Sequence, residues 1–558
     1  MTKNMKKGIS PVYLIVQVIA CIITALVVNY LFVTPLNLHS SLFWFKIWIM
    51  LFCVAIAFVI SSFLMCFLIT HSFETEAECE EAKTKIWKPM RVFVVVAGAL
   101  CVFNILSAWS GAEIFNADRY ADLIDVEETN SSVIPELTDA NIALMDTESA
   151  KMLGDREIGE IENFSAFEVS DNYVQLNVNN MAVKVSALDY TGFFKWLQNR
   201  ESGVPGYVIV SATDMDAEYV ELETGMRYTP GAFFGDNLMR YVQSQYPTTM
   251  FYDYHLEIDE EGTPYYIMPT YETTIGMFGG EKITGAMIVD PVSGVMDYYD
   301  IEEIPEWVDV VVHGDLATQQ YNLKYKNING WWNGTGLGAN TDCRKTTDDY
   351  GYVIKDNDVY LYTGVTSYAS DNSNLGFILV NERTGEFQYI QAAGANEASA
   401  VASANGLAQN YGYSASFPSL VTVNGELTYL GVMTDNARIV RRYYMVNVED
   451  YGLVAVNETL DATLADYTGL SDQAGTEQYE PQLETGFETD TEVEGQQVTF
   501  VVDTLVFAEK NGTTYVYLGT ETEDIYVAEF DSNRELMFVE PGDTITGTIR
   551  NGLLVLWE

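Results

Sequence analysis

The chain begins with three long apolar runs, which distinguish this region from the rest of the sequence. They cover roughly Pro11–Val33, Leu42–Thr70 and Val92–Trp109. Each is close to the ~17–25 residues that a helix needs to span a bilayer. The alternative, three buried helices of a soluble core, fits runs this long and uncharged poorly. We therefore expect a membrane domain over residues 1–110 with three transmembrane helices.

After residue 110 the pattern changes to short apolar stretches separated by turn residues. One sequence pattern typical of a hairpin occurs there twice. Residues 284–299, TGAMIVDPVSGVMDYY, and 375–390, LGFILVNERTGEFQYI, share an apolar strand, Asp or Asn, a Ser/Thr-Gly pair and a second strand. Glycine at such a position favours a positive φ. We predict that Gly294 and Gly385 lie in matching turns.

Helical segments precede the strand sets. Alanine content and apolar spacing predict helices at 235–246 and 395–413, and less strongly at 314–326. A helix followed by an antiparallel meander, repeated, is an α+β arrangement. The expected domains are an N-terminal α+β part (111–234), a first unit (235–305), a second unit (306–392) and a third unit (393–470).

The late hairpins give these units a resemblance to PepSY-type domains. The matching residues are Asp290, Ser293 and Gly294 in the first unit and Asn381, Thr384 and Gly385 in the second. The third unit departs from the pattern, because residues 449–452 lack the Ser/Thr-Gly pair. The chain also resembles uncharacterised multi-pass membrane proteins of Gram-positive bacteria. The PepSY resemblance implies extracytoplasmic binding or control of peptidases.

The sequence predicts that the C-terminal end forms a separate domain. Residues 471–494 are acidic and poor in aliphatic side chains, which predicts a solvated linker. Residues 495–558 alternate like five or six short strands, so we expect a small OB-like β-barrel there.

The distribution of charge along the chain limits which partners it can bind and indicates its orientation. The chain carries 79 acidic and 29 basic residues. Residues 1–109 hold eight of the bases and five of the acids, so the rest has a net charge of −53. Such a body is repelled by phosphate backbones, and we expect no nucleic-acid partner. Basic residues precede the first span and separate the second from the third, and the loop between the first two spans has none, which places the N-terminus in the cytoplasm and the body outside.

Cysteine usage fits that location. Of six cysteines only Cys343 lies after residue 110, so the body has no intrachain disulfide. A thiolate needs a base, and His313 is a conceivable partner. The surrounding TDCRKTTDDY resembles no nucleophile motif, however, and we expect a loop cysteine without a catalytic role.

The remaining candidates for a binding or metal site are a glycine-rich motif, a pair of tryptophans and three acidic clusters. The glycines of NGTGLGAN (333–340) lack the strand and helix of a dinucleotide site, so we expect a loop. Trp331 and Trp332 beside it are the candidate binding surface: exposed, they would stack on a sugar, but we expect them to plug a seam between units. Acidic clusters at 214–218, 259–261 and 348–358 lack a full calcium-loop pattern, which leaves the metal question open.

These observations favour a membrane-anchored extracytoplasmic binding or scaffold protein. Its expected partners are the lipid bilayer and another cell-envelope protein or peptide, and association of identical chains stays open. We expect no cofactor and no catalytic residue. The alternative is a cell-envelope enzyme that acts on cell-wall polymer through an unrecognised site.

Overall fold

The computed structural model describes most of the chain, and the chain forms two compact units, Met1–Gln478 and Tyr479–Glu558. Helices and strands are both abundant, which confirms the α+β class. The described residues are 11–70, 76–137, 142–157, 159, 164–212, 216–335, 337–368, 373–408, 412–476, 497–502, 504–510, 513–520, 525–529, 536, 539, 542–550 and 553–556.

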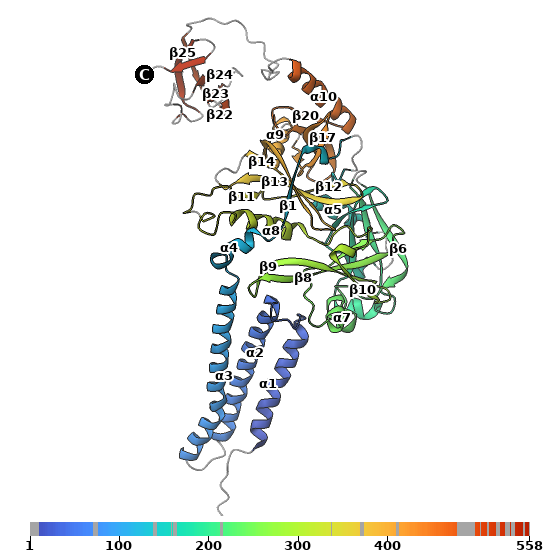
Figure 1. Ribbon diagram of the computed structural model, residues 1–558, viewed down its shortest axis with the longest axis vertical. Coiled ribbons are helices and arrows are strands. Elements are labelled where there is room, and N and C mark those ends of the chain that lie inside the picture. Colours follow the sequence, from blue (N-terminus) through green and yellow to red (C-terminus); the bar gives the residue numbers. More distant parts are fainter. Residues whose placement is uncertain are drawn as a thin grey trace, which may run out of the picture. The chain divides into compact units, whose positions relative to one another are not determined.

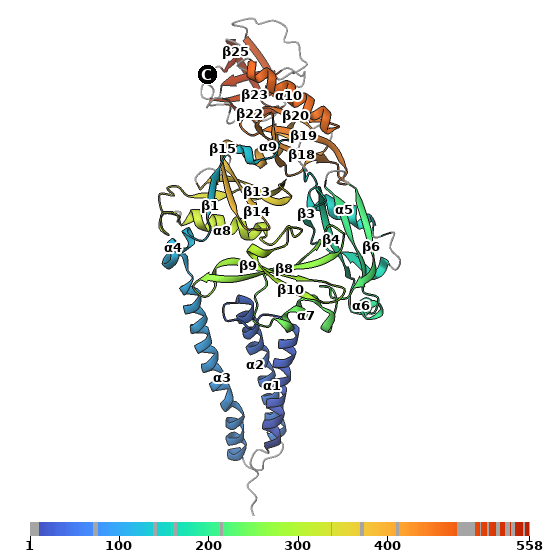
Figure 2. The same ribbon diagram turned by 45° about the vertical axis from the view of Figure 1, so that its right-hand side comes forward.

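Three apolar helices lie together at the N-terminal end (Figures 1 and 2). They are α1 (Pro11–Leu31), α2 (Ser41–Thr70) and α3 (Glu76–Ser110). Two segments of the described chain, Ser41–Phe67 and Ile86–Ala121, are long and apolar enough to cross a membrane. The apolar stretch of α1, Ile15–Leu31, is shorter. Two of the three predicted spans therefore have the length and composition to cross a membrane, and the three-span topology stays a prediction.

The helix α3 begins earlier than its apolar run. We expected a loop up to about residue 91, but the chain is helical from Glu76 and continues through Pro89. The segment EAECEEAKTK is rich in Ala, Glu and Lys, which are strong helix formers. This propensity explains why the helix extends beyond the apolar residues.

The ends of these helices meet the hairpin of β8 (Pro264–Ile275) and β9 (Gly279–Val289). The backbone N–H of Met277 donates to Ser110 Oγ at 3.1 Å, and its carbonyl lies 3.1 Å from His39 Nδ1. Gly276 has φ +62°, and a Cβ there would lie 2.4 Å from the nitrogen of Gly111. Only glycine allows this close approach.

Four antiparallel sheets follow, and each contains four strands paired in sequence order. Sheet N has β2 (Phe167–Val169), β3 (Val174–Val178), β4 (Met181–Tyr190), β5 (Val204–Ser211) and β6 (Ala217–Met226). Sheet 1 has β7 (His255–Ile258), β8, β9 and β10 (Met296–Asp300). Sheet 2 has β11 (Arg344–Thr346), β12 (Gly351–Lys355), β13 (Asp358–Ser367), β14 (Ser373–Asn381) and β15 (Phe387–Ala395), joined by β1 (Val126–Thr129). Sheet 3 has β16 (Ser414–Ala415), β17 (Ser419–Val423), β18 (Glu426–Thr434), β19 (Val440–Asn447) and β20 (Val454–Asn457).

Helices precede or cover these sheets, as the sequence predicts. The described helices after α3 are α4 (Glu113–Ala121), α5 (Thr147–Glu157), α6 (Phe193–Asn199), α7 (Leu238–Gln245), α8 (Gly314–Lys326), α9 (Glu397–Leu407) and α10 (Leu460–Thr476). The helix predicted at 314–326 matches α8, and those predicted at 235–246 and 395–413 contain α7 and α9.

The core runs between the sheets as successive layers. One apolar cluster joins sheet N to sheet 1, a second joins sheet 1 to α8 and sheet 2, and a third joins sheet 2 to α9 and sheet 3. Two strands that each pair with a single neighbour in their sheet are nevertheless buried on both faces: all four residues of β7 and all five of β17 are buried. Strands of this kind read as continuous apolar runs rather than alternating ones.

The paired turns adopt the predicted conformation. Gly294 has φ +79° and Gly385 has φ +75°. The third unit keeps part of this turn: Asn447 Oδ1 accepts the backbone N–H groups of Glu449 and Asp450, each at 2.9 Å. It closes one residue later, because the Asn447 N–H donates to the carbonyl of Leu453, six residues on, whereas Asp290 and Asn381 donate to carbonyls five residues on. Whether the units belong to the PepSY class stays a prediction.

The C-terminal compact unit, Tyr479–Glu558, contains short antiparallel strands. They are β21 (Gln497–Val501), β22 (Thr504–Lys510), β23 (Thr513–Gly519), β24 (Ile525–Glu529), β25 (Thr544–Arg550) and β26 (Leu553–Leu556). The described strands form two three-stranded sheets, and closure into an OB-like barrel stays a prediction. The predicted linker at 471–494 is helical up to Thr476, and its remainder lies outside the described residues.

Candidate functional site

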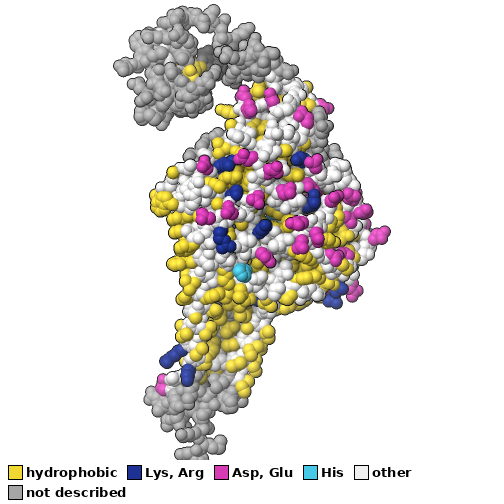
Figure 3. All heavy atoms as spheres, in the orientation of Figure 1, with side chains coloured by type: hydrophobic (Ala, Val, Ile, Leu, Met, Phe, Trp, Pro, Cys, Tyr) yellow, Lys and Arg dark blue, Asp and Glu magenta, His cyan; other side chains and the backbone are white. Residues whose placement is uncertain are grey.

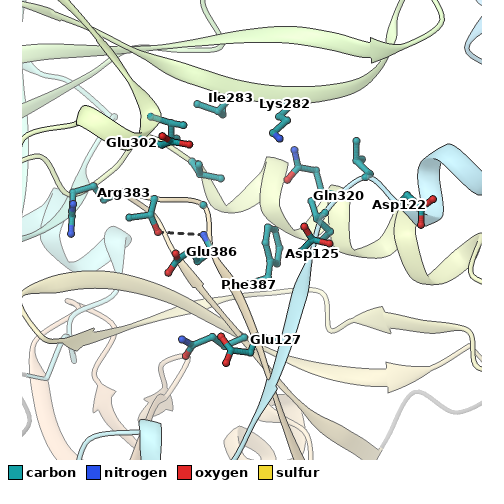
Figure 4. Close-up of a pocket in the computed structure, with 17 residues that line it drawn as sticks. Asp122, Asp125, Glu127, Lys282, Ile283, Glu302, Gln320, Arg383, Glu386 and Phe387 are labelled. Atoms are coloured by element: carbon teal, nitrogen blue, oxygen red, sulfur yellow. Dashed lines mark hydrogen bonds between the residues drawn. The ribbon is translucent and has the colours of Figure 1, made fainter.

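A cleft of about 660 Å³ opens between sheet 1 and sheet 2 (Figure 4). We refer to it as the inter-sheet cleft. Sheet 1 contributes Lys282 and Ile283, α8 contributes Gln320, and the turn before β15 contributes Arg383 to Glu386. The other walls are Ile301 and Glu302, which follow β10, and the segment that leads from α4 into β1. A volume of this size lies within the ~300–1,000 Å³ typical of ligand pockets.

One wall of the cleft is built by strand addition. The strand β1 pairs in parallel with β15, with Val126 opposite Phe387 and Thr129 opposite Ile390. The segment that follows α3 and α4 is therefore incorporated into the edge of sheet 2. This register brings Glu127 of β1 and Asp125 before it to the cleft.

The turn that faces the cleft is held rigidly. Arg383 Nη2 lies 2.7 Å from Asp358 Oδ1 and 2.8 Å from Oδ2, and its Nε donates to Oδ1 at 2.9 Å. Asn381 Nδ2 donates to the same carboxylate at 2.6 Å. Both members of the Arg383–Asp358 pair are largely buried. Paired carboxylate–guanidinium bonds of this kind fix orientation as well as charge.

The open face of the cleft is acidic. Since the charge of Arg383 is compensated by Asp358, Lys282 is the one lining cation without a described ion pair. It faces five exposed carboxylates, which are Asp122, Asp125, Glu127, Glu302 and Glu386. A concave surface with this excess of negative charge attracts positively charged ligands.

Behind the cleft, ionisable side chains from three sheets meet in the interior; we call them the buried cluster. Glu257 of β7 accepts the backbone N–H groups of Asp309 at 2.8 Å and Val310 at 3.0 Å. Its Oε1 also lies 2.8 Å from His255 Nε2. Asp309 in turn accepts the backbone N–H of Asn177 at 2.7 Å. The cluster thus links sheets N and 1 to the segment before α8.

Burial dominates the electrostatics of this cluster. It raises the pKa of Asp309 well above its usual range, and the neighbouring Glu257 adds to the effect. Glu382, in the turn of sheet 2, has its pKa raised for the same reasons, although Lys184 opposes the rise. Burial lowers the pKa of Lys184 to about 8. Strongly shifted groups often mark functional sites, but structural networks shift them too.

The buried cluster cannot touch a ligand in this structure. His255, Glu257, Asp309, Glu382 and Lys184 are each at most 3% exposed. The cluster therefore positions the turn of residues 381–386 and the cleft wall from behind.

The tryptophan candidates lie outside the cleft. Trp331 and Trp332 sit in the turn after α8 with ring centroids 6.0 Å apart. Trp332 is 60% exposed and Trp331 half-buried. The expectation that both plug a seam is wrong for Trp332, because a side chain that is 60% exposed does not fill a seam.

The structure does not bring Cys343 and His313 together. His313 precedes the first residue of α8, whereas Cys343 Sγ contacts the carbonyl of Lys326 at the other end of that helix. Thirteen residues of helix separate the two ends by about 20 Å. Burial raises the pKa of the Cys343 thiol. Both features agree with a structural cysteine.

The acidic turns hold no described metal site. Among the described residues, no three His, Cys, Asp or Glu side chains are grouped so that they could hold an ion. Asp358 is engaged by Arg383, and Asp259 accepts the backbone N–H of Thr263 at 2.8 Å. Asp214 lies outside the described residues.

Sequence reasoning missed both the cleft and the buried cluster. The cluster leaves one signal: His255 and Glu257 alternate with apolar residues in β7, so two polar side chains share one face of a buried strand. The cleft has no local signal, because its walls come from segments up to 266 residues apart, Asp122 and Gln388.

Comparisons with known proteins add little. No protein-family model matches the chain, and no curated relative matches. A levansucrase variant from B. megaterium aligns at 10% identity and a TM-score of 0.18, over 77% of this chain and 97% of the other. A second solved structure, an RGII complex, aligns at 8% identity and a TM-score of 0.15, over 75% and 95%. TM-scores this low fall short of a shared fold, so neither likeness bears on this chain.

Proposed function

We propose that this chain is a membrane-anchored extracytoplasmic binding or scaffold protein, and that the inter-sheet cleft holds a positively charged segment of another envelope protein or peptide. The observation that carries the proposal is the cleft itself, with its rigid turn, its volume and its excess of exposed carboxylates. The PepSY resemblance of the two units that form its walls agrees with a binding role.

The membrane helices support the anchoring. In Figure 3 hydrophobic side chains cover the helical part, whereas acidic side chains gather over the sheets. On α3, Lys88 and Arg91 lie about 33 Å and 29 Å along the helix from Ser110, at the sheet end. That separation matches the ~30 Å hydrocarbon core. With the basic end in the cytoplasm, the sheets lie outside.

The chemistry of the cleft defines the ligand class. A peptide with Lys or Arg side chains would pair with Asp125, Glu302 and Glu386, which are exposed and lie on three different walls. An acidic ligand would be repelled by the cleft and by the whole body. Attraction between exposed charges is screened over about 8–10 Å, so binding weakens in salt.

A peptide titration tests the proposal. The full-length protein in nanodiscs is titrated with fluorescent basic, neutral and acidic hexapeptide mixtures. The basic mixture should bind most tightly, and Glu302→Lys with Glu386→Lys should abolish that preference. A matched control, Glu449→Lys with Asp450→Lys, adds the same charge in sheet 3 and should leave it largely intact. Equal loss in both double variants would reject the cleft as the site.

The same assay addresses the enzyme alternative. Cell-wall oligosaccharides replace the peptides in a parallel titration. Saturable binding and turnover of an oligosaccharide, with no binding of basic peptides, would favour the cell-envelope enzyme over the binding protein.

A further inference from the structure

An exposed aromatic patch lies on the sheet-bearing part of the chain, close to the helices. Phe194 is 75% exposed, Phe234 53%, Leu197 45% and Phe193 36%. We call these four residues the aromatic patch. Large apolar side chains that gather on one surface, rather than occurring singly, mark interaction sites.

The side chains of the aromatic patch contact one another and pack on a buried residue. The ring of Phe193 lies 5.4 Å from that of Phe194 and 6.0 Å from that of Phe234. Buried Trp196 supports it from behind, 5.6 Å from Phe234. Phe234 has φ +56°, a left-handed backbone that a bulky residue rarely adopts. The chain thus accepts local strain at a residue whose ring points largely to solvent.

The patch is continuous with the end of a membrane helix. Tyr30, one residue before the end of α1, has its ring 6.4 Å from that of Phe234. Arg240 of α7 lies over the Tyr30 ring at 4.1 Å and donates to the Tyr30 carbonyl at 2.7 Å. The backbone N–H of Leu36 donates to the carbonyl of Pro247, just after α7, at 2.6 Å. Figures 1 and 2 both show α7 beside this end of α1.

The charges around the patch suit a lipid surface. The helix α6, which carries three of its four residues, also carries Lys195 and is followed by Arg200. Nearby Asp236 is compensated by Arg227 at 2.9 Å. A short helix with Phe and Leu on one side and basic residues at its edges is typical of segments that lie in the membrane interface. Glu201 follows Arg200, so α6 and the two residues after it carry two basic side chains and one acidic side chain.

We infer that the aromatic patch inserts into the lipid headgroup region of the bilayer, on the side of the membrane that faces the sheets. The inference rests on the proposed membrane anchoring, since α1 must reach that surface for Tyr30 to mark its level. Aromatic side chains concentrate at this depth in membrane proteins. The patch gives the sheets a second attachment, through α6 and Phe234, in addition to the helices.

Photo-cross-linking in a defined bilayer tests this inference. The full-length protein carrying benzoyl-phenylalanine at Phe194 is reconstituted in nanodiscs of phosphatidylcholine and phosphatidylglycerol, irradiated and analysed by intact mass. The control carries the same group at Tyr451, an aromatic residue that is 58% exposed in a turn of sheet 3. We expect a mass increase of one phospholipid at position 194, several times more abundant than at 451.

Other outcomes overturn the inference in distinguishable ways. Equal lipid adducts at the two positions, or a protein–protein adduct at 194, would reject the patch as a lipid site while leaving the anchoring intact. Release of the unmodified protein from cell membranes by alkaline carbonate would reject the anchoring itself, and the inference with it.

Discussion

Asp290 and Asn381 occupy the same place in two turns of the chain, 91 residues apart. The Oδ1 atom of each accepts the backbone N–H groups two and three residues further on. Each carbonyl also accepts the N–H of the glycine four residues on, Gly294 or Gly385, at 2.8 Å. One turn therefore serves both sheets, and in sheet 2 it forms a wall of the inter-sheet cleft.

The two glycines should differ in how strongly they resist substitution. Both have positive φ, so Gly385→Val should lower the free energy of unfolding by about 1 kcal/mol or more. Gly294→Val should cost more, because its Cβ would also lie 2.6 Å from the Tyr228 ring. Gly406→Ala, in an open position of α9, is the control and should be neutral or stabilising. Chemical denaturation in detergent measures all three, and losses at Gly294 and Gly385 no larger than that of Gly406→Ala would refute the shared turn.

The Arg383–Asp358 pair should be a main support of the cleft wall. Arg383→Ala leaves a largely buried carboxylate without its partner and should cost about 2 kcal/mol or more. Arg441→Ala removes a similar bond to Asp435 on an exposed surface and should cost far less. The Arg383 variant should also weaken peptide binding, which isothermal titration measures. An unchanged affinity would mean that this turn is not part of the site.

Stability should depend on pH through Glu397. This side chain is 2% exposed, its Oε1 accepts the N–H of Gly364 at 2.7 Å, and burial raises its pKa to about 7. The folded state therefore holds a proton that the unfolded chain loses near pH 4.5. Its contribution is fully present below that pH and is lost as pH rises to about 7, a change of up to about 3 kcal/mol.

The variant Glu397→Gln tests this dependence. It should flatten the fall in unfolding free energy between pH 4.5 and 7 and should be more stable than the native chain at pH 8. Glu386→Gln, at an exposed position, controls for the loss of a surface charge. If Glu397→Gln shows the native pH profile, the carboxyl is not protonated in the folded state.

Orientation has its own test. The proposed orientation puts Lys88 and Arg91 at the cytoplasmic end of α3, so protease added to intact protoplasts should digest the chain after residue 110. The segment between α2 and α3 should be cut only after lysis. Protection of the C-terminal body in intact cells would reverse the orientation.

The fold was largely predictable where the signal is local. The apolar runs, the helix at 314–326 and the turn glycines are each readable from fewer than 30 neighbouring residues, and the structure confirms them. The start of α3 was not predictable from the apolar run, which begins at Val92. The helix begins earlier, at Glu76, because the residues before the run have high helix propensity. The apolar pattern marks only the apolar part of α3, not where the helix begins.

The site was not predictable, because it depends on contacts between distant segments. Nothing in the residues around Asp125 indicates that β1 joins sheet 2 in parallel. Trp332 was singled out for its type, yet it is exposed and lies outside the cleft. Residue type marks candidates, but only the packing of sheet 1 against sheet 2 shows which side chains converge.

Cross-linking from the cleft in living cells tests the central claim most directly. Benzoyl-phenylalanine is placed at Glu386 in the cleft and, as control, at Glu449, exposed in a turn of sheet 3. The binding-protein account predicts one discrete adduct from position 386, on a Lys- or Arg-rich segment of an envelope protein, and its loss in Asp125→Lys with Glu302→Lys. The same adducts at both positions, or none at 386, would contradict it.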